Sequence, residues 1–299
     1  MLHVLFDVIV PVALVAALGA LVGRWKAVPV APVSTLVFYL FSPALVIHSL
    51  ATTQLSAGAS FRIFGVMIAT YVAMYVAATA WSSLVRHDRS MRAGFALAAT
   101  IPNVGNMGLP VAQLAFGAPG LEIAVMNFIA GSVLVNSASI VVASTAGGSP
   151  RSALRAPFRY PALYAAAVGV AINASGVTLP IAIDAPITTL SNASVPVMLV
   201  VLGLQLQHAV SSDHLTDVFV VNAGRLLIAP VVAWFTATGL GLADATRGTL
   251  VVLAAMPTAV IATILATEFN AQPAFVTRAV VTSTLASMLS LTVLITLVR

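Results

Sequence analysis

Two stretches of the chain share one pattern: MRAGFALAATIP at Met91–Pro102 and TRGTLVVLAAMP at Thr246–Pro257. Each carries an arginine, nine mostly apolar residues and then a proline inside a longer hydrophobic run. A separation of 155 residues relates Arg92 to Arg247 and also relates the two prolines. Proline interrupts a helix, and an interrupted helix is tolerated at bilayer depth where it lines a cavity or the protein interior. The pattern therefore predicts one broken membrane helix that occurs twice, which is typical of a transporter's binding site.

The composition places the chain in a membrane. Hydrophobic residues make up 60% of the 299 residues and charged residues only 7%, whereas a soluble domain carries about 25% charged residues. There are no cysteines, which excludes disulfides, thiolate metal sites and cysteine nucleophiles. The net charge of +5 does not indicate nucleic-acid binding, because the basic residues lie in short loops between apolar runs.

About 20 apolar residues cross a bilayer, and on that basis we predict ten membrane-spanning helices. Their expected ranges are residues 4–23, 31–50, 61–85, 93–116, 121–146, 157–176, 186–207, 218–242, 248–268 and 274–298. The longest polar connection is 147–156, and it separates a first repeat, 1–146, from a second repeat, 157–299.

Two further landmarks relate these halves. Pro11–Gly19 (PVALVAALG) parallels Pro161–Gly169 (PALYAAAVG) at an offset of 150 residues, and Pro43 parallels Pro196 at an offset of 153. Each half contains five expected helices. An odd number of helices ends on the opposite side of the membrane, so the second half must enter the membrane in the opposite direction. The expected fold class is an all-α membrane protein, a 5+5 inverted repeat in which helices 4 and 9 are broken and cross.

Lysine and arginine are distributed unequally between the expected loops. The loops after helices 1, 3 and 5 hold Arg24, Lys26, Arg86, Arg89, Arg92, Arg151, Arg155 and Arg159, against Arg62, Arg247 and Arg299 on the other side. Basic residues favour the cytoplasmic side. We therefore expect a multi-pass protein of the cell (inner) membrane with both termini outside the cytoplasm.

The interruption in the fourth helix reads IPNVGNMGLP, at Ile101–Pro110. Pro102 removes a backbone donor, and the freed backbone groups would lie beside the side chains of Asn103 and Asn106. The positive end of a half-helix suits a carboxylate. The alternative is a proline kink that neighbouring helices stabilise.

The interruption in the ninth helix reads AAMPTAVIATILA, with Pro257 followed by Thr258 and with no asparagine. Two half-helix N-termini would meet at one point near the bilayer midplane, where we expect an organic anion to bind.

For each of the other polar residues within the expected helices, the sequence is compatible with two roles. His48 either contacts substrate or a proton, or lies at the membrane interface. Asn192 lines the cavity or bonds helix to helix, and the same choice holds for Asn127 and Asn136, with Asn136 the better cavity candidate. Arg225 either pairs with an anion or extends to the interface.

The sequence lacks the motifs of several ATP-driven and hydrolytic enzymes. The sequence has no GxxxxGK[ST], HExxH or GxSxG, so we expect neither an ATP-driven pump nor an enzyme. Asp213, His214 and Asp217 resemble a metal cluster, but a loop with helix-capping Asp explains them better. We expect no metal and no cofactor.

Several motifs resemble the auxin efflux carrier (AEC) family of membrane transport proteins, in order and over nearly the whole chain. They are FYLFSPALVIHSLA (38–51), IPNVGNMGLP (101–110), SNASVPVMLVVLGLQL (191–206), RLLIAP (225–230) and AAMPTAVIATILATEFN (254–270). The family includes plant PIN auxin exporters and bacterial carriers linked to malonate and malate. The central loop is much shorter here than in the plant exporters.

The resemblance implies a fold similar to the sodium/bile-acid symporters. Helices 1, 2, 6 and 7 would form a scaffold, and helices 3–5 and 8–10 a transport unit that moves in an elevator-like manner. Substrate would bind near Pro102, Asn103, Asn106 and Pro257, and His48 matches a histidine of the plant exporters.

We therefore expect a secondary transporter of a small organic anion, either a carboxylate or an auxin-like acid. A proton or sodium as coupling ion and a homodimer through the scaffold remain open. The alternative is a passive channel or a substrate-sensing receptor on the same fold.

Overall fold

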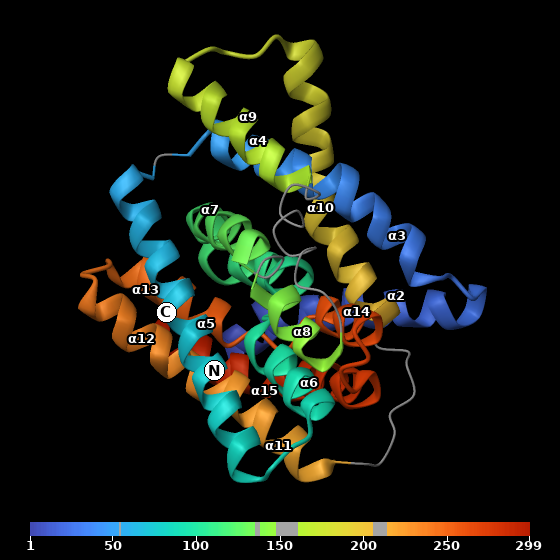
Figure 1. The fold of residues 1–299 in the computed structure, drawn as a ribbon. Coiled ribbons are helices and arrows are strands. Elements are labelled where there is room, and N and C mark those ends of the chain that lie inside the picture. Colours follow the sequence, from blue (N-terminus) through green and yellow to red (C-terminus); the bar gives the residue numbers. More distant parts are fainter. Residues whose placement is uncertain (54, 135–137, 148–160, 206–213) are drawn as a thin grey trace.

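The computed structural model describes the chain except for residues 54, 135–137, 148–160 and 206–213. Its described parts form helices joined by short turns (Figure 1). The helices before the central gap are α1 (Leu2–Val4), η1 (Leu5–Ile9), α2 (Val10–Lys26), α3 (Val30–Leu36), η2 (Val37–Phe41), α4 (Ser42–Ala51), α5 (Ala57–Leu84), α6 (Arg89–Thr100), η3 (Val104–Gly108), α7 (Leu109–Leu134) and α8 (Ile140–Gly147). Those after it are α9 (Pro161–Ser175), α10 (Ile181–Gln205), α11 (Leu215–Ala223), η7 (Gly224–Ile228), α12 (Ala229–Gly239), α13 (Asp244–Ala254), α14 (Val260–Glu268) and α15 (Pro273–Val298).

Seven helical segments in the described part of the chain are long and apolar enough to cross a membrane. They are Leu2–Lys26, Val30–Ala51, Gly58–Leu84, Val104–Ser132, Ile181–Gln205, Leu215–Gly239 and Pro273–Val298. Helix α9 is apolar but shorter, and α6, α13 and α14 are short because the chain is interrupted beside them. The prediction of an all-helical, multi-pass membrane protein is confirmed at this level.

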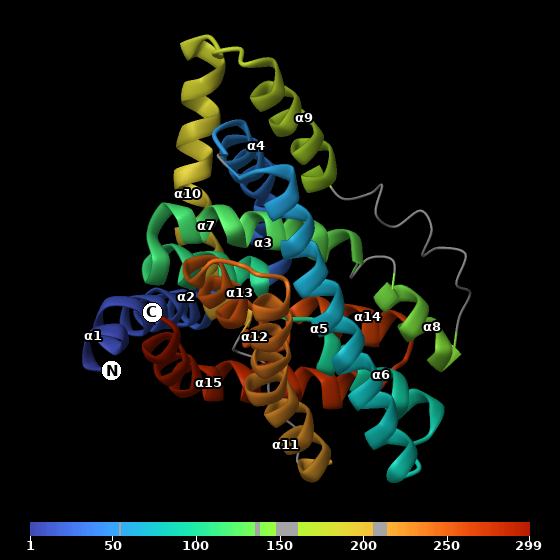
Figure 2. The same ribbon diagram turned by 90° about the vertical axis from the view of Figure 1, so that its left-hand side faces the viewer.

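Helix α7 joins parts of two expected spans across a kink at Gly117. This residue has φ 69° and ψ −157°, a backbone conformation that a residue with a Cβ adopts only with strain. Pro119 follows two residues later. In Figure 2 the ribbon labelled α7 doubles back on itself. The bend separates the end of the expected span 93–116 from the beginning of 121–146.

Proline explains where π-helical turns form. Each of the four π-helices that the structure describes in full ends two residues before a proline: Pro11, Pro43, Pro110 or Pro230. Proline lacks an N–H, and its ring clashes with the carbonyl four residues earlier. A wider turn relieves that clash, and π-turns of this kind are frequent at functional sites.

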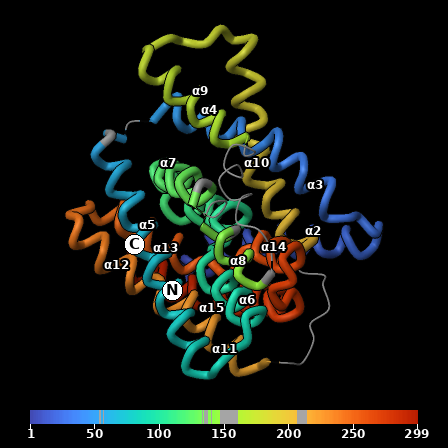
Figure 3. Tube along the Cα trace, in the orientation of Figure 1, coloured from blue at the N-terminus to red at the C-terminus, as the bar shows by residue number. Residues whose placement is uncertain are grey.

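The helices pack in two groups. Helix α10 packs against α2 and α4, and α9 packs against α4. In the other group, α5 contacts α6, α7 and α12, while α13 contacts α12 and α7. Figure 3 places α4 and α9 at the opposite end of the molecule from α11, and Figure 2 shows the same separation.

Helices α2 and α10 approach closely because glycine lies at their contact. A Cβ built on Gly203 would lie 1.8 Å from the carbonyl oxygen of Ala16, and one on Gly19 would lie 2.5 Å from that of Val200. Small residues allow membrane helices to pack backbone against backbone. This contact fixes the geometry of the first group.

The two half-helices that precede the interruptions lie in the core. Every residue of Ala93–Thr100 in α6 and of Gly248–Ala254 in α13 is buried. A helix that is apolar on all sides is found in the interior. The interruptions that end these two helices are therefore also interior.

Candidate functional site

The first break, Ile101–Asn103, follows from Pro102. Helix α6 ends at Thr100, since the residue before a proline avoids helical geometry, and Ile101 is extended with φ −101° and ψ 97°. Helix η3 begins at Val104 and leads into α7.

The second break, Ala255–Ala259, surrounds Pro257 in the same way. Helix α13 ends at Ala254, Ala259 is extended with φ −79° and ψ 149°, and α14 begins at Val260.

The two breaks pair with each other as a short antiparallel bridge between Pro102 and Thr258. The backbone N–H of Asn103 donates to the carbonyl of Pro257 at 2.7 Å, and the N–H of Ala259 donates to the carbonyl of Ile101 at 2.9 Å. At bilayer depth no water replaces a missing backbone hydrogen bond. Each break therefore satisfies part of the other's backbone.

Thr258 supplies a donor that Pro102 removes. The carbonyl of Ala98 lies four residues before Pro102, so its usual helical donor is absent. The Thr258 hydroxyl donates to this carbonyl at 2.9 Å, while the backbone N–H of Thr258 donates to Ser283 Oγ at 3.1 Å. The side chain of Thr258 is 0% exposed. Its position therefore stabilises the contact between the breaks.

We predict that Thr258→Val, which keeps the side-chain shape, lowers the stability of the folded protein. The Ala98 carbonyl would be buried without its donor, a change that costs about 1–3 kcal/mol. Thermal unfolding of the purified protein in detergent measures the effect. Thr267→Val is the matched control, because Thr267 is exposed and its hydroxyl donates only within its own helix. Equal melting temperatures for the two variants would contradict this role.

Arg225 donates hydrogen bonds to two further carbonyls that lack their helical donors. The carbonyl of Ala99 loses its helical donor because the Asn103 N–H is used by the bridge, and that of Ala254 loses its donor because the Thr258 N–H is used by Ser283. Arg225 Nη1 donates to Ala99 at 3.0 Å, and Nη2 donates to Ala254 at 2.8 Å. The sequence left open whether Arg225 extends to the membrane interface, and its 1% exposure shows that it does not.

A cavity of about 270 Å³ lies beside the two breaks. Helices α3, η2, α4 and α10 contribute to one part of its wall, and α5, α6, η3, α7, η7, α13 and α14 contribute to the rest, together with residues of the breaks. Three of the four fully described π-helices, η2, η3 and η7, thus supply lining residues. The wall is mostly apolar, and among its described residues only Arg225 carries a charge.

Three buried groups in this wall can donate a hydrogen bond but have no partner among the described residues. They are Nδ2 of Asn103, a residue that is 4% exposed, Nε of Arg225 and the hydroxyl of Ser34. Buried polar groups are nearly always hydrogen-bonded. Unpaired donors in a cavity wall can donate to a ligand oxygen, and the N-terminal end of the η3–α7 segment adds further N–H groups.

The residues singled out from the sequence fall into three sets. Pro102, Asn103 and Asn106 line the cavity, as does Asn127. Pro257 and Thr258 lie in the second break but are not among the lining residues.

The remaining candidates lie elsewhere. His48 is half-buried, and its Nδ1 lies 3.4 Å from the hydroxyl of Thr188. This contact joins α4 to α10, and neither residue lines the cavity. Asn192 is exposed on α10. Asn136 lies outside the described residues.

Tyr71 and Gln205 line the cavity and were not anticipated from the sequence. The hydroxyl of Tyr71 lies 3.1 Å from Ser139 Oγ. A polar residue within an apolar span is the only local signal for either of them. That signal does not indicate which face of the helix meets the cavity, since the face depends on tertiary packing.

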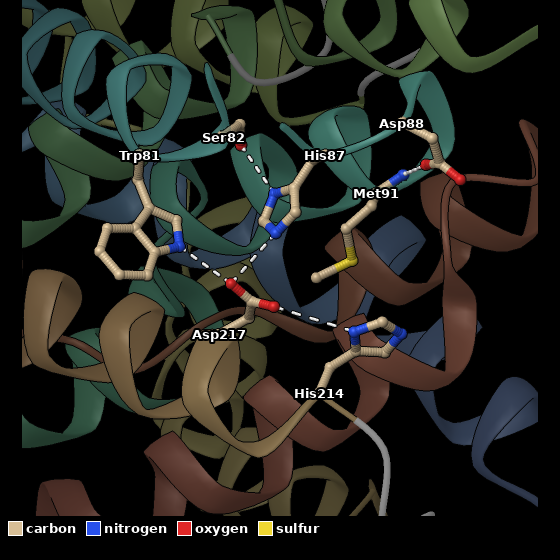
Figure 4. Close-up of polar contacts among 7 residues, drawn as sticks. All are labelled: Trp81, Ser82, His87, Asp88, Met91, His214 and Asp217. Carbon is tan, nitrogen blue, oxygen red and sulfur yellow. Dashed lines mark hydrogen bonds and ion pairs between the residues drawn. The ribbon is translucent and has the colours of Figure 1, made fainter. Parts of the chain in front are cut away.

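A second polar cluster joins the α5–α6 turn to α11 (Figure 4). Asp217 accepts a hydrogen bond from Trp81 Nε1 at 2.9 Å and lies 3.2 Å from His87 Nε2 and 3.8 Å from His214 Nδ1. In the described ranges, no group of three His, Asp or Glu side chains is placed to hold a metal ion. Asp213 lies outside those ranges. The cluster therefore connects two elements at one end of the molecule.

Comparison with known proteins adds two findings. A family model described as membrane transport protein matches this chain twice, at residues 4–149 and 148–295. A protein of Methanothermobacter thermautotrophicus named as an uncharacterized transporter is 30% identical over 216 residues, which cover 71% of this chain and 70% of that protein.

Proposed function

Because this chain belongs to the membrane transport protein family (auxin efflux carrier family), we propose that it is a secondary transporter of a small organic anion. The observation that carries the proposal is the cavity beside the two breaks, with unpaired donors on Asn103 and Arg225. The transported acid would be a carboxylate or an auxin-like acid, and it would cross the cytoplasmic membrane.

The chemistry of the cavity supports an anion. Arg225 contributes the Nε–H of its guanidinium group, and no Asp or Glu stands among the described lining residues. Asn103 offers an amide N–H, and a half-helix N-terminus favours negative charge. Apolar side chains such as Val66, Phe128 and Ile261 would surround the hydrocarbon part of the acid. A site with a few oriented donors in an apolar wall is typical for a small-molecule ligand.

We propose that the chain is a 5+5 inverted repeat in which the fourth and ninth helices cross at the two breaks. The double match to one family model supports two repeats. The equivalent positions of Pro102 and Pro257, and the bridge between their neighbourhoods, support a crossing there.

The two packing groups support an elevator-like mechanism. Helices α2, α4, α9 and α10 would form the scaffold, and α5–α8 with α11–α15 would form the transport unit. The cavity receives Ser42 and Met198 from the first group and Thr100 and Leu253 from the second, so it lies between them. Movement of one group against the other would expose that boundary alternately to the two sides of the membrane.

Counterflow in proteoliposomes tests the proposed function. Vesicles that contain the purified protein are loaded with one unlabelled carboxylate or aromatic acid and diluted into a trace of the same labelled acid. A transporter exchanges the two, so we expect transient accumulation of label that requires the internal acid. Flux without this stimulation would indicate a passive channel instead. Binding without flux would indicate a receptor, and either result would contradict the proposal.

A further inference from the structure

Arg225 contacts equivalent positions in the two halves of the chain. Its carbonyl partners Ala99 and Ala254 are separated by 155 residues, the same offset that relates Pro102 to Pro257. Both carbonyls lie in the last turn of a half-helix, α6 or α13. Nη2 also lies 3.3 Å from the carbonyl of Met256 in the second break. One guanidinium group thus caps the C-terminal ends of both half-helices.

The charges involved are balanced. A helix C-terminus carries about half an elementary negative charge, so two of them together amount to about one. Arg225 carries one positive charge in a side chain that is 1% exposed. Charge buried at bilayer depth is costly unless it is paired. The arginine and the two helix ends therefore satisfy one another.

In transporters with broken helices, half-helix C-termini and unwound carbonyls commonly coordinate the coupling cation. Here the guanidinium group occupies the equivalent carbonyls. We propose that Arg225 is a tethered cation that replaces a mobile sodium ion at the meeting point of the two breaks. Its Nε–H, which has no partner in the described part of the chain, remains for the substrate anion. The contact of Arg225 with the substrate anion rests on the proposed function. The replacement of a sodium ion by Arg225 does not.

Chemical rescue tests this assignment without any transported substrate. The melting temperatures of the wild type and of Arg225→Ala are measured in detergent with roughly 20 mM guanidinium, sodium or choline chloride, far below denaturing guanidinium concentrations. The wild type should show the same melting temperature in all three salts. Arg225→Ala should melt at least about 5 °C lower in choline, and guanidinium should restore part of that loss in a saturable manner.

Arg278→Ala is the matched control. Arg278 is also buried, at 3% exposure, but its Nε and Nη1 have no partner among the residues described. Its removal leaves a space of similar size, and these two nitrogens donate to no helix end among the described residues. Guanidinium should therefore stabilise Arg225→Ala more than Arg278→Ala. An equal response would overturn the proposal, as would saturable stabilisation of the wild type by sodium.

If Arg225→Ala does not fold, two other variants decide the question. Arg225→Lys keeps the charge and Arg225→Met keeps the length without it, so the lysine variant should melt at the higher temperature. Equal melting temperatures would overturn the proposal. Counterflow of the wild type should also persist when choline replaces sodium on both sides. A chain with no flux for any acid would refute the proposed function and leave the thermal result to decide the role of Arg225.

Discussion

Replacing Gly203 with alanine should abolish accumulation of the folded protein. A Cβ at this position would lie 1.8 Å from the carbonyl oxygen of Ala16 and 2.8 Å from the N atom of Ala20. Both are backbone atoms of α2, so no side chain can move aside to make room. Helices α2 and α10 would have to separate along their contact, and we expect a loss of about 3 kcal/mol or more.

Size-exclusion chromatography in detergent and thermal unfolding measure this loss. Gly239→Ala is the matched control, because a Cβ on Gly239 has no atom within 4 Å and the same substitution there adds no clash. We expect this control to behave as the wild type. A Gly203→Ala protein that elutes and melts as the wild type does would show that the close contact of α2 with α10 is not required.

Replacing Asn103 with alanine should reduce the affinity for the proposed organic anion by roughly 10- to 100-fold, because a hydrogen bond to a charged group contributes about 1.5–3 kcal/mol. The substitution removes the unpaired Nδ2 donor from the cavity wall. It leaves the backbone N–H of Asn103, which donates to Pro257, and its carbonyl, which accepts from Gly108. Folding should therefore be preserved while binding is lost.

Titration of the purified variant with the acid identified by counterflow measures the affinity, and thermal unfolding without ligand verifies folding. Gln113→Ala serves as the control, because Gln113 is an exposed amide on α7 outside the cavity wall. Unchanged affinity in Asn103→Ala would exclude this side chain from the binding site. A large fall in the melting temperature without ligand would instead assign Asn103 a structural role.

The positions of the two breaks are the part of the site that the sequence predicts best. Proline acts on its own backbone and on the residue before it, and α6 and α13 end shortly before Pro102 and Pro257. Asn103 and Asn106 follow the first proline directly and therefore lie at the opened backbone. Local rules were sufficient for these residues.

Residues that act across the structure could not be predicted in the same way. The sequence places Thr258 beside the second proline, but it does not indicate that the Thr258 hydroxyl donates to Ala98 in the other half of the chain. Arg225 stood out as a charge within an apolar span, but its partners are carbonyls that other hydrogen bonds leave free. The partners of Thr258 and Arg225 depend on which backbone donors at the breaks are already used. Those hydrogen bonds form only when the two halves of the chain pack together.

A membrane helix in a cavity wall must present one face outward and another face to the cavity. The π-helices in this wall allow the cavity face to change independently of the outer face. A π-turn holds one residue more than an α-turn, so deleting a residue from η2, η3 or η7 would remove the bulge and leave the flanking helix faces in place. The exposed outer surface of η2 and η7 would stay the same while the side chains that line the cavity changed. Sequence length at these turns is thus a variable that can alter the cavity wall without redesign of the outer helix surface.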